Sequence, residues 1–311
     1  MSLYAFGDLL VDSDLPLPEL IPAGGSRADS RLRLLVDSPS FDTAESIFES
    51  KLDDGRTWMV CARHEEGYLL RFVDLAIFTV SFDGRRIALC AAEGAPAETL
   101  RHLFLDHVFP LSLSLGGELA LHAAATVTSS GAAAFVGDTG EGKSTLTASF
   151  AQSGFPPLSD DCLVVREHGG DVFAIPSYPG LRLWPDAVSS LAIDAAHATA
   201  VAHYSDKQRV LMTNASAGGP VPLRRVYVLA PNEAATGAPV VVELLSRRDG
   251  VVELLKHTYR IEVRERDAIA AEWDRVDRVC QRCGVRRLSY PRAFATLPAV
   301  REAVVEDLRR G

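Results

Sequence analysis

The chain has 311 residues, 47% of them hydrophobic and 23% charged, with a formal net charge of -9 at pH 7. This length favours two domains over one, and the composition is that of a globular rather than a disordered protein. The negative charge argues against a general binder of nucleic acid or of anionic membranes, because both attract basic proteins, although a nucleotide can still bind at a local loop.

The N-terminal stretch does not resemble a targeting signal. MSLYAFGDLLVDSDLPLPEL carries acidic residues and no basic residue before Arg27, whereas a signal peptide begins with positive charge. No apolar run reaches the roughly 18 residues that a membrane helix needs. The five cysteines are odd in number and scattered, unlike a secreted disulfide framework. We therefore expect a cytoplasmic protein without a membrane partner.

Residues 1–110 predict a β-rich N-terminal domain, with a candidate role in peptide recognition. Segments 31–36, 57–63 and 67–92 are rich in Val, Ile, Leu and Phe. Turn sequences at 53–55 and 83–84 separate them and indicate antiparallel hairpins.

Segment 95–116 predicts a helix, because Leu100, Leu103, Phe104 and Val108 fall at helical spacing, and Pro110 and Gly116 break the pattern afterwards. We place the domain boundary between residues 100 and 118 and assign 111–311 to a second, α/β domain. This domain begins with predicted strands at 120–127 and 132–136, a glycine-rich loop and a helix at 144–154. A hairpin about Gly169-Gly170, strands at 224–230 and 284–292, and a largely helical C-terminal third complete the prediction.

The glycine-rich loop matches G-x-x-x-x-G-K-[ST] in full and lies between a buried strand and a helix. In such loops backbone N–H groups surround phosphate oxygens, the lysine reaches the β and γ phosphates, and the serine hydroxyl ligates Mg²⁺. The chain has only four lysines among its 32 basic residues, and one of them, Lys143, lies here, where a compact charge fits. We expect ATP and Mg²⁺ to bind at Gly137, Asp138, Thr139, Gly140, Glu141, Gly142, Lys143, Ser144 and Thr145.

Two acidic residues and a histidine flank this loop. Asp160 and Asp161 follow Lys143 by about twenty residues, and adjacent carboxylates can divide metal binding and proton acceptance between them. Alternatively, Ser-Asp-Asp is a solvated turn. His122 precedes the loop on the neighbouring strand, where a lone histidine is more often a core residue than a functional one.

Together, His122-Ala-Ala-Ala, FVGDTGEGKST and LSDD resemble the catalytic domain of HPr kinase/phosphorylase, over about residues 119–210. That family shares its catalytic core with phosphoenolpyruvate carboxykinases. The resemblance implies Asp160 as the base toward a serine, Asp161 and Ser144 as metal ligands, and His122 as a residue near the phosphates or the metal. It also leaves a homo-oligomer open.

The chain departs from HPr kinases in two places. The segment IPSYPGLRLWPDAV does not match their glycine-rich signature, and residues 1–110 do not resemble their N-terminal domain. We therefore do not expect HPr as the substrate, nor phosphorolysis. Seven stretches carry a closer resemblance: YAFGDLLVDSDLPLPEL, LHAAA, the glycine-rich loop, LSDD, YPGLRLWPD, SDKQR and LLKHTYR. Through them the chain resembles, nearly end to end, the HPr-kinase-like proteins of lasso peptide clusters. This resemblance implies a kinase that phosphorylates a serine hydroxyl on a small peptide.

Two other functions stay open: a non-catalytic nucleotide-binding module, and a kinase for a small hydroxyl compound. Arg182, Lys207 and Arg209 are candidates for contacting phosphates or a peptide carboxylate, with solvated surface charge as the alternative. Nothing in the spacing of His257 and Tyr259 places them in the site. Cys280 and Cys283 form a lone C-x-x-C, which is either a metal or redox half-site or two core-facing residues of a helix.

Overall fold

The structure is a computed structural model. It describes residues 2–25, 27–39, 44–52, 54–178, 180–194, 196, 198–212, 218–232, 237–261 and 266–310. The chain divides into two compact units. Unit 1 comprises 1–118, 202–204 and 260–264, and unit 2 comprises 119–201, 205–259 and 265–311.

Within the described residues, unit 1 contains a nine-stranded sheet in the order β3-β1-β2-β4-β9-β8-β7-β6-β5. Its strands are β1 (Ser2–Phe6), β2 (Leu9–Ser13), β3 (Ile21–Pro22), β4 (Ser30–Leu34), β5 (Glu45–Lys51), β6 (Thr57–His64), β7 (Gly67–Phe72), β8 (Ala76–Ser81) and β9 (Arg86–Ala91). The expected hairpins are confirmed for β5 to β9, which form an antiparallel meander. The expectation is wrong for 31–36, because β4 pairs in parallel with both β2 and β9.

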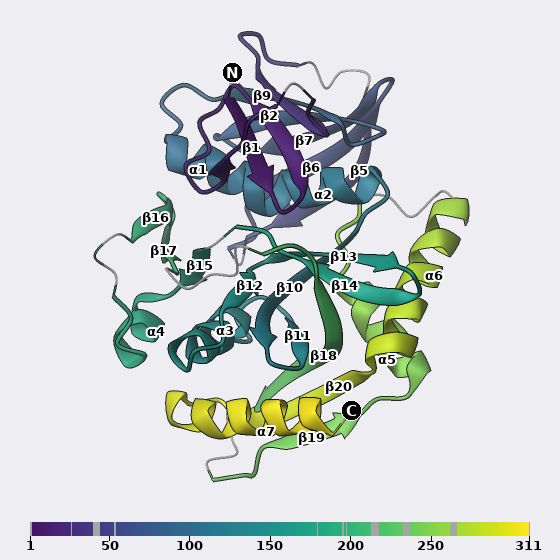
Figure 1. The fold of residues 1–311 in the computed structure, drawn as a ribbon. Coiled ribbons are helices and arrows are strands. Elements are labelled where there is room, and N and C mark those ends of the chain that lie inside the picture. The colour runs from purple at the N-terminus through teal and green to yellow at the C-terminus, as the bar shows by residue number, and fades with distance from the viewer. Residues whose placement is uncertain are drawn as a thin grey trace. The chain divides into compact units, whose positions relative to one another are not determined.

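A continuous helical segment packs on this sheet and comprises α1 (Ala97–His102), a π-helical turn (Leu103–Val108) and α2 (Phe109–Leu115) (Figure 1). Phe109 meets Phe6 of β1 with ring centroids 5.1 Å apart. The expected break at Pro110 is wrong, whereas the segment does end before Gly116. The physical reason is that Pro110 falls in the first turn of α2, where its missing N–H is tolerated, after the wider π turn in which Phe109 N–H reaches Phe104 O.

Unit 2 is built on a second, larger α/β framework. Its strands are β10 (Leu119–Thr128), β11 (Gly131–Val136), β12 (Pro157–Ser159), β13 (Cys162–His168), β14 (Asp171–Ile175), β15 (Gly180–Leu183), β16 (Thr199–Ala202), β17 (Ser205–Leu211), β18 (Val221–Asn232), β19 (Val241–Leu244) and β20 (Val285–Pro291). Its helices are α3 (Lys143–Gln152), α4 (Pro185–Ser190), α5 (Arg247–Lys256), α6 (Arg266–Cys283) and α7 (Leu297–Arg309), with a 3₁₀ turn at Phe294–Thr296. The predicted α/β class is confirmed.

Strand β11 lies at the centre of unit 2, antiparallel to β10 and parallel to β18, which in turn is parallel to β20. Its side chains alternate between two cores. Ala132, Ala134 and Val136 pack with residues of α5 and α6, while Ala133 and Phe135 pack with residues of α3 and α7. A strand covered on both faces is apolar throughout, which is why this run shows no alternation in the sequence.

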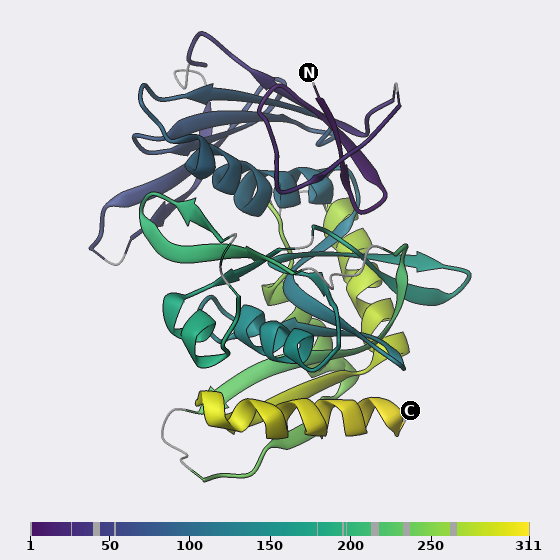
Figure 2. The same ribbon diagram turned by 60° about the vertical axis from the view of Figure 1, so that its left-hand side comes forward.

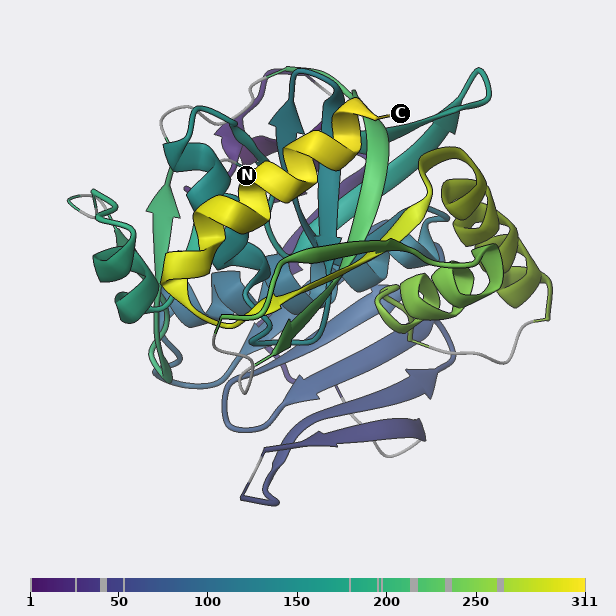
Figure 3. The ribbon, with the colours of Figure 1, turned by 90° about the horizontal axis from the view of Figure 1, so that it is seen from below.

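The helices form two layers around these strands. Helices α5 and α6 lie on the opposite side from α3 (Figure 1), α3 and α7 lie side by side (Figure 2), and α7 runs across the strands (Figure 3). Arg301 of α7 donates a 2.8 Å hydrogen bond to the Ser149 hydroxyl of α3. This arrangement holds the helix that follows the glycine-rich loop firmly against the sheet.

The C-x-x-C residues lie on the buried face of α6. Cys280 and Cys283 both pack in the core, and the Cys283 thiol donates to Leu223 O at 3.1 Å. Burial raises the pKa of each thiol to about 12. The structure therefore favours the interpretation of Cys280 and Cys283 as core-facing residues of a helix. Among the described residues, no group of three or more His, Cys, Asp or Glu could hold a metal.

The predicted hairpin about Gly169-Gly170 is confirmed as β13–β14, and the strands predicted at 224–230 and 284–292 are β18 and β20. The polar segment around residues 203–210, to which the sequence assigns no element, contains strand β17, paired with β15. Across the helices that the structure describes, none is both long and apolar enough to cross a membrane.

Candidate active site

The glycine-rich loop connects β11 to α3. Gly140 and Gly142 have φ of +91° and +95°, in the left-handed region that side chains rarely adopt. The Glu141 carboxylate accepts a 2.7 Å hydrogen bond from Asp138 N, which closes the loop on itself. The turn therefore places the first N–H groups of α3 at its mouth, as an anion site requires.

Lys143 opens α3, and its ammonium group returns across the loop. Nζ donates to Gly137 O at 2.7 Å and to Asp138 O at 3.1 Å. Burial lowers the pKa of Lys143, while the carboxylates of Asp161 and Asp160 oppose this shift. The lysine thus lies at the glycine-rich loop, residues 137–144, which we call the phosphate loop after the motif that it matches. Two carboxylates lie close enough to raise the pKa of this lysine.

Two residues near the end of β20 contact the loop from outside it. Tyr290 OH donates to Glu141 O at 3.4 Å, and the Arg292 guanidinium donates to Gly140 O at 2.6 Å. Sequence reasoning missed both residues, because they lie about 150 positions from the loop and match no motif.

Asp160 and Asp161 form the bend between β12 and β13, and both of these strands pair with β10. The Asp160 side chain is almost fully buried. Its Oδ1 accepts a 2.7 Å hydrogen bond from Ser144 Oγ, and its Oδ2 accepts one of 2.8 Å from Arg182 N. Burial raises the pKa of this carboxyl, and the Arg182 guanidinium opposes the shift.

Asp161 faces a different set of groups. His122 Nε2 lies 2.9 Å from its Oδ1, and the Arg182 guanidinium pairs with the same oxygen. Tyr259 OH lies 3.1 Å from Asp161 O and 3.3 Å from its Oδ2. The Asp161 side chain is 15% exposed, against 1% for Asp160, so of the two carboxylates it is the one that an incoming group can reach.

Strand β10 explains why His122 meets Asp161. His122 is directly opposite Cys162 in the β10–β13 register, which brings the preceding residue, Asp161, beside it. The backbone N–H of His122 donates a hydrogen bond of 2.7 Å to His257 O. The interpretation of His122 as an isolated core residue is therefore not what the structure shows, since its ring contacts the Asp161 carboxylate.

The three basic candidates lie on the small β15–β17–β16 sheet. Arg182 of β15 is directly opposite Arg209 of β17, and both are buried. Arg182 contacts both aspartates, Arg209 lies over the Tyr178 ring at 5.3 Å, and Lys207 lies over the Trp184 ring at 5.2 Å. For the two arginines, burial excludes solvated surface charge.

The structure thus joins the phosphate loop, His122, the aspartate pair and Arg182 into one constellation. Within it, the loop serine donates to Asp160, for which the resemblance implies the role of base, and the histidine pairs with Asp161, for which the resemblance implies metal binding. Among residues without a sequence signal, it adds Tyr259 through its hydroxyl and His257 through its carbonyl.

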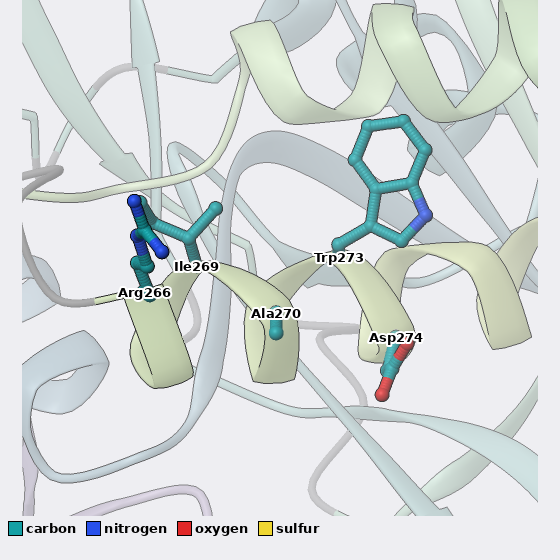
Figure 4. Close-up of a pocket in the computed structure, with 5 residues that line it drawn as sticks. All are labelled: Arg266, Ile269, Ala270, Trp273 and Asp274. Atoms are coloured by element: carbon teal, nitrogen blue, oxygen red, sulfur yellow. The ribbon is translucent and has the colours of Figure 1, made fainter.

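A separate pocket lies on α6 and is lined by Arg266, Ile269, Ala270, Trp273 and Asp274 (Figure 4). All five residues come from that one helix, and none belongs to the phosphate loop or to the groups around the aspartate pair. The pocket is therefore distinct from the candidate active site.

Comparisons with known proteins give similarity to solved structures alone. No protein-family model matches the sequence, and the comparison with curated proteins gives no match. Among solved structures, the HPr(Ser) kinase/phosphatase from Coxiella burnetii is similar to this chain at 11% identity and a TM-score of 0.29, over 60% of this chain and 97% of that one. Values this low do not assign a function, so any functional proposal depends on the contacts within the site.

Proposed function

We propose that the chain is an ATP-dependent kinase that phosphorylates a serine hydroxyl on a small peptide, a lasso-type precursor with a C-terminal serine. The observation that carries the proposal is the junction of the phosphate loop with the aspartate pair, through the 2.7 Å hydrogen bond from Ser144 to Asp160. A nucleotide-binding loop alone requires only phosphate contacts, whereas transfer to a hydroxyl also requires a reachable base beside them.

The contacts favour exchanging the two aspartate roles implied by the resemblance. Asp160 is buried and bonded to the loop serine, so we assign it to the metal side. Asp161 is more exposed and held by His122 and Arg182, so we assign it as the base. The oxygens of Ser144 and Asp160 fit Mg²⁺, which prefers such hard ligands and would neutralise phosphate charge when bound.

In the proposed reaction, the Asp161 carboxylate accepts the proton of the serine hydroxyl as that oxygen bonds to the γ-phosphorus. The bond between the γ-phosphorus and the β–γ bridging oxygen breaks, and ADP leaves. Lys143 and the N–H groups of the loop hold the phosphates in line, which supplies most of the acceleration in this kind of catalysis. Every residue in this scheme belongs to unit 2, and we propose peptide recognition for unit 1.

The test is transfer from labelled ATP to peptides that end in serine, with the same peptides ending in alanine as controls. Transfer to the serine peptides alone supports the proposal, and a parallel Lys143→Ala preparation excludes a contaminating kinase. Tight ATP binding without transfer to any acceptor would instead identify a non-catalytic module. Transfer only to small hydroxyl compounds would identify a metabolite kinase.

A further inference from the structure

Asp161 has an unusual backbone conformation. Its φ is +73°, and among the described residues only Asp74 and Ala192 share a positive φ without being glycine. A residue held in this region costs on the order of 1 kcal/mol or more, and it persists only where its surroundings determine it. Contacts with neighbouring groups must therefore hold the backbone of Asp161 in this conformation. The strained residue is the one whose carboxylate we assign as the base.

The Tyr259 hydroxyl contacts both parts of this residue. It lies 3.1 Å from the Asp161 backbone oxygen and 3.3 Å from Oδ2. His122 and Arg182 contact Oδ1, and Ala123 N donates to the backbone oxygen at 3.2 Å. The Tyr259 hydroxyl thus spans the carboxylate and the main chain of Asp161, so it fixes the direction of the side chain relative to the strained peptide.

Tyr259 is itself anchored to the strand that carries His122. Its N–H donates to Ala120 O at 3.0 Å, and Thr258 forms an isolated antiparallel bridge with Leu121. Its ring lies 6.0 Å from the His122 ring in an edge-on arrangement. Residues 257–259 therefore form a short strap along β10, and this strap fixes both members of the His122–Asp161 pair.

We propose that Tyr259 is a positioning residue for phosphoryl transfer, which acts by holding Asp161 in its left-handed conformation and directing its carboxylate toward His122. This inference rests on the proposed function. The hydroxyl contacts that support it are made with Asp161, so Tyr259 governs the orientation of the base and not the binding of nucleotide.

The test is Tyr259→Phe in the full chain, which removes one oxygen and keeps the ring. Misplacing a catalytic group lowers kcat by about 10- to 100-fold, and we expect a fall in that range with the KM for ATP and the nucleotide Kd within about twofold. The matched control is Tyr227→Phe, which removes a buried hydroxyl bonded to Asp307 at 2.9 Å and distant in sequence from the site. It should leave kcat unchanged, and a purely structural role for Tyr259 would alter melting temperature without this split.

A second measurement does not depend on transfer. The ring nitrogens of His122 in a ¹⁵N-histidine-labelled chain report its hydrogen bond to Asp161, and their signals should shift in Tyr259→Phe but not in Tyr227→Phe. An unchanged kcat in an active enzyme, or unchanged His122 signals, would overturn the inference while leaving the kinase proposal intact. If the wild-type chain transfers phosphate to no peptide, the kinase proposal fails, and the His122 signals still decide whether Tyr259 holds the pair.

Discussion

The Ser144 hydroxyl donates a hydrogen bond of 2.7 Å to the Asp160 carboxylate, across sixteen positions of the chain. This contact joins the first turn of α3 to the end of β12. Asp161, the next residue, turns its carboxylate to His122 instead. Besides Arg182, which contacts both, the two neighbouring carboxylates thus have different partners, and this difference allows them to have different roles.

Asparagine substitutions separate these roles. For Asp160→Asn, we expect the Mg²⁺ concentration at half-maximal activity to rise by about 10- to 100-fold, as loss of a carboxylate at a metal site does. For Asp161→Asn, we expect kcat to fall by about 10²- to 10⁴-fold, the usual contribution of a positioned base, with ATP affinity retained. Steady-state kinetics over a Mg²⁺ titration measure both. The opposite pattern would return the base to Asp160.

Lys143→Ala removes the charge at the phosphate loop. Charge-assisted hydrogen bonds are worth roughly 1.5–3 kcal/mol, so we expect ATP affinity to fall by about 10- to 100-fold. Calorimetric titration with a non-hydrolysable ATP analogue measures the change. Lys256→Ala is the matched control, because Lys256 is exposed on α5 and pairs with Glu253 at 3.0 Å. Equal affinities in all three chains would remove the loop from nucleotide binding.

His257 should make stability depend on pH. Burial holds its pKa below the ordinary value of 6.5, and the neighbouring His122 and Lys143 lower it further. As pH falls below 6.5, the unfolded chain binds this proton first, so the free energy of unfolding should fall until the folded-state pKa is passed. Urea denaturation from about pH 7.5 to about pH 5.5 measures it. His257→Gln should flatten this slope, and substitution of the exposed His168 should not; a slope unaffected by His257→Gln would contradict the assignment.

The cysteines should differ in reactivity. Thiol reagents require an accessible thiolate, whereas Cys280 and Cys283 are buried with pKa values near 12. Among the cysteines only Cys90 is partly exposed. A thiol assay on the native chain should therefore detect Cys90, with the others reacting after denaturation. Native-state signal that persists in Cys90→Ser would show that the α6 pair is accessible.

Local patterns predicted much of unit 2. The loop motif, the flanking buried strand and the glycine hairpin each occupy a short segment, and the structure has each of them. The π turn before Pro110 was not predictable in this way, since the apolar residues of that segment keep ordinary helical spacing. The parallel pairing of β4 with β2 and β9 was not predictable either, because the sequence of a strand does not show in which direction its neighbours run.

Site residues close to the motif in sequence were predictable, and distant ones were not. His122 lies on β10, which pairs with the strand that leads into the loop, and the aspartate pair follows at the bend between β12 and β13, so the order of the motifs predicts both. Tyr259 is 98 positions from Asp161, and its place in the site depends on how one short segment lies along β10. The partners of the two aspartates were also not predictable from the motif. The side chains of adjacent residues can point in opposite directions, and the motif does not show the direction of each.

The strap along β10 also bears on when the chain becomes active. A ribosome releases the phosphate loop and both aspartates well before residues 257–259, and before β20, the parallel neighbour of β18. Contacts of such long sequence separation form slowly and late in folding. The nascent chain therefore carries a recognisable phosphate loop long before it carries the strap that holds Asp161, the base in our proposal. The onset of phosphate transfer during refolding would mark completion of the C-terminal third, not of the loop itself.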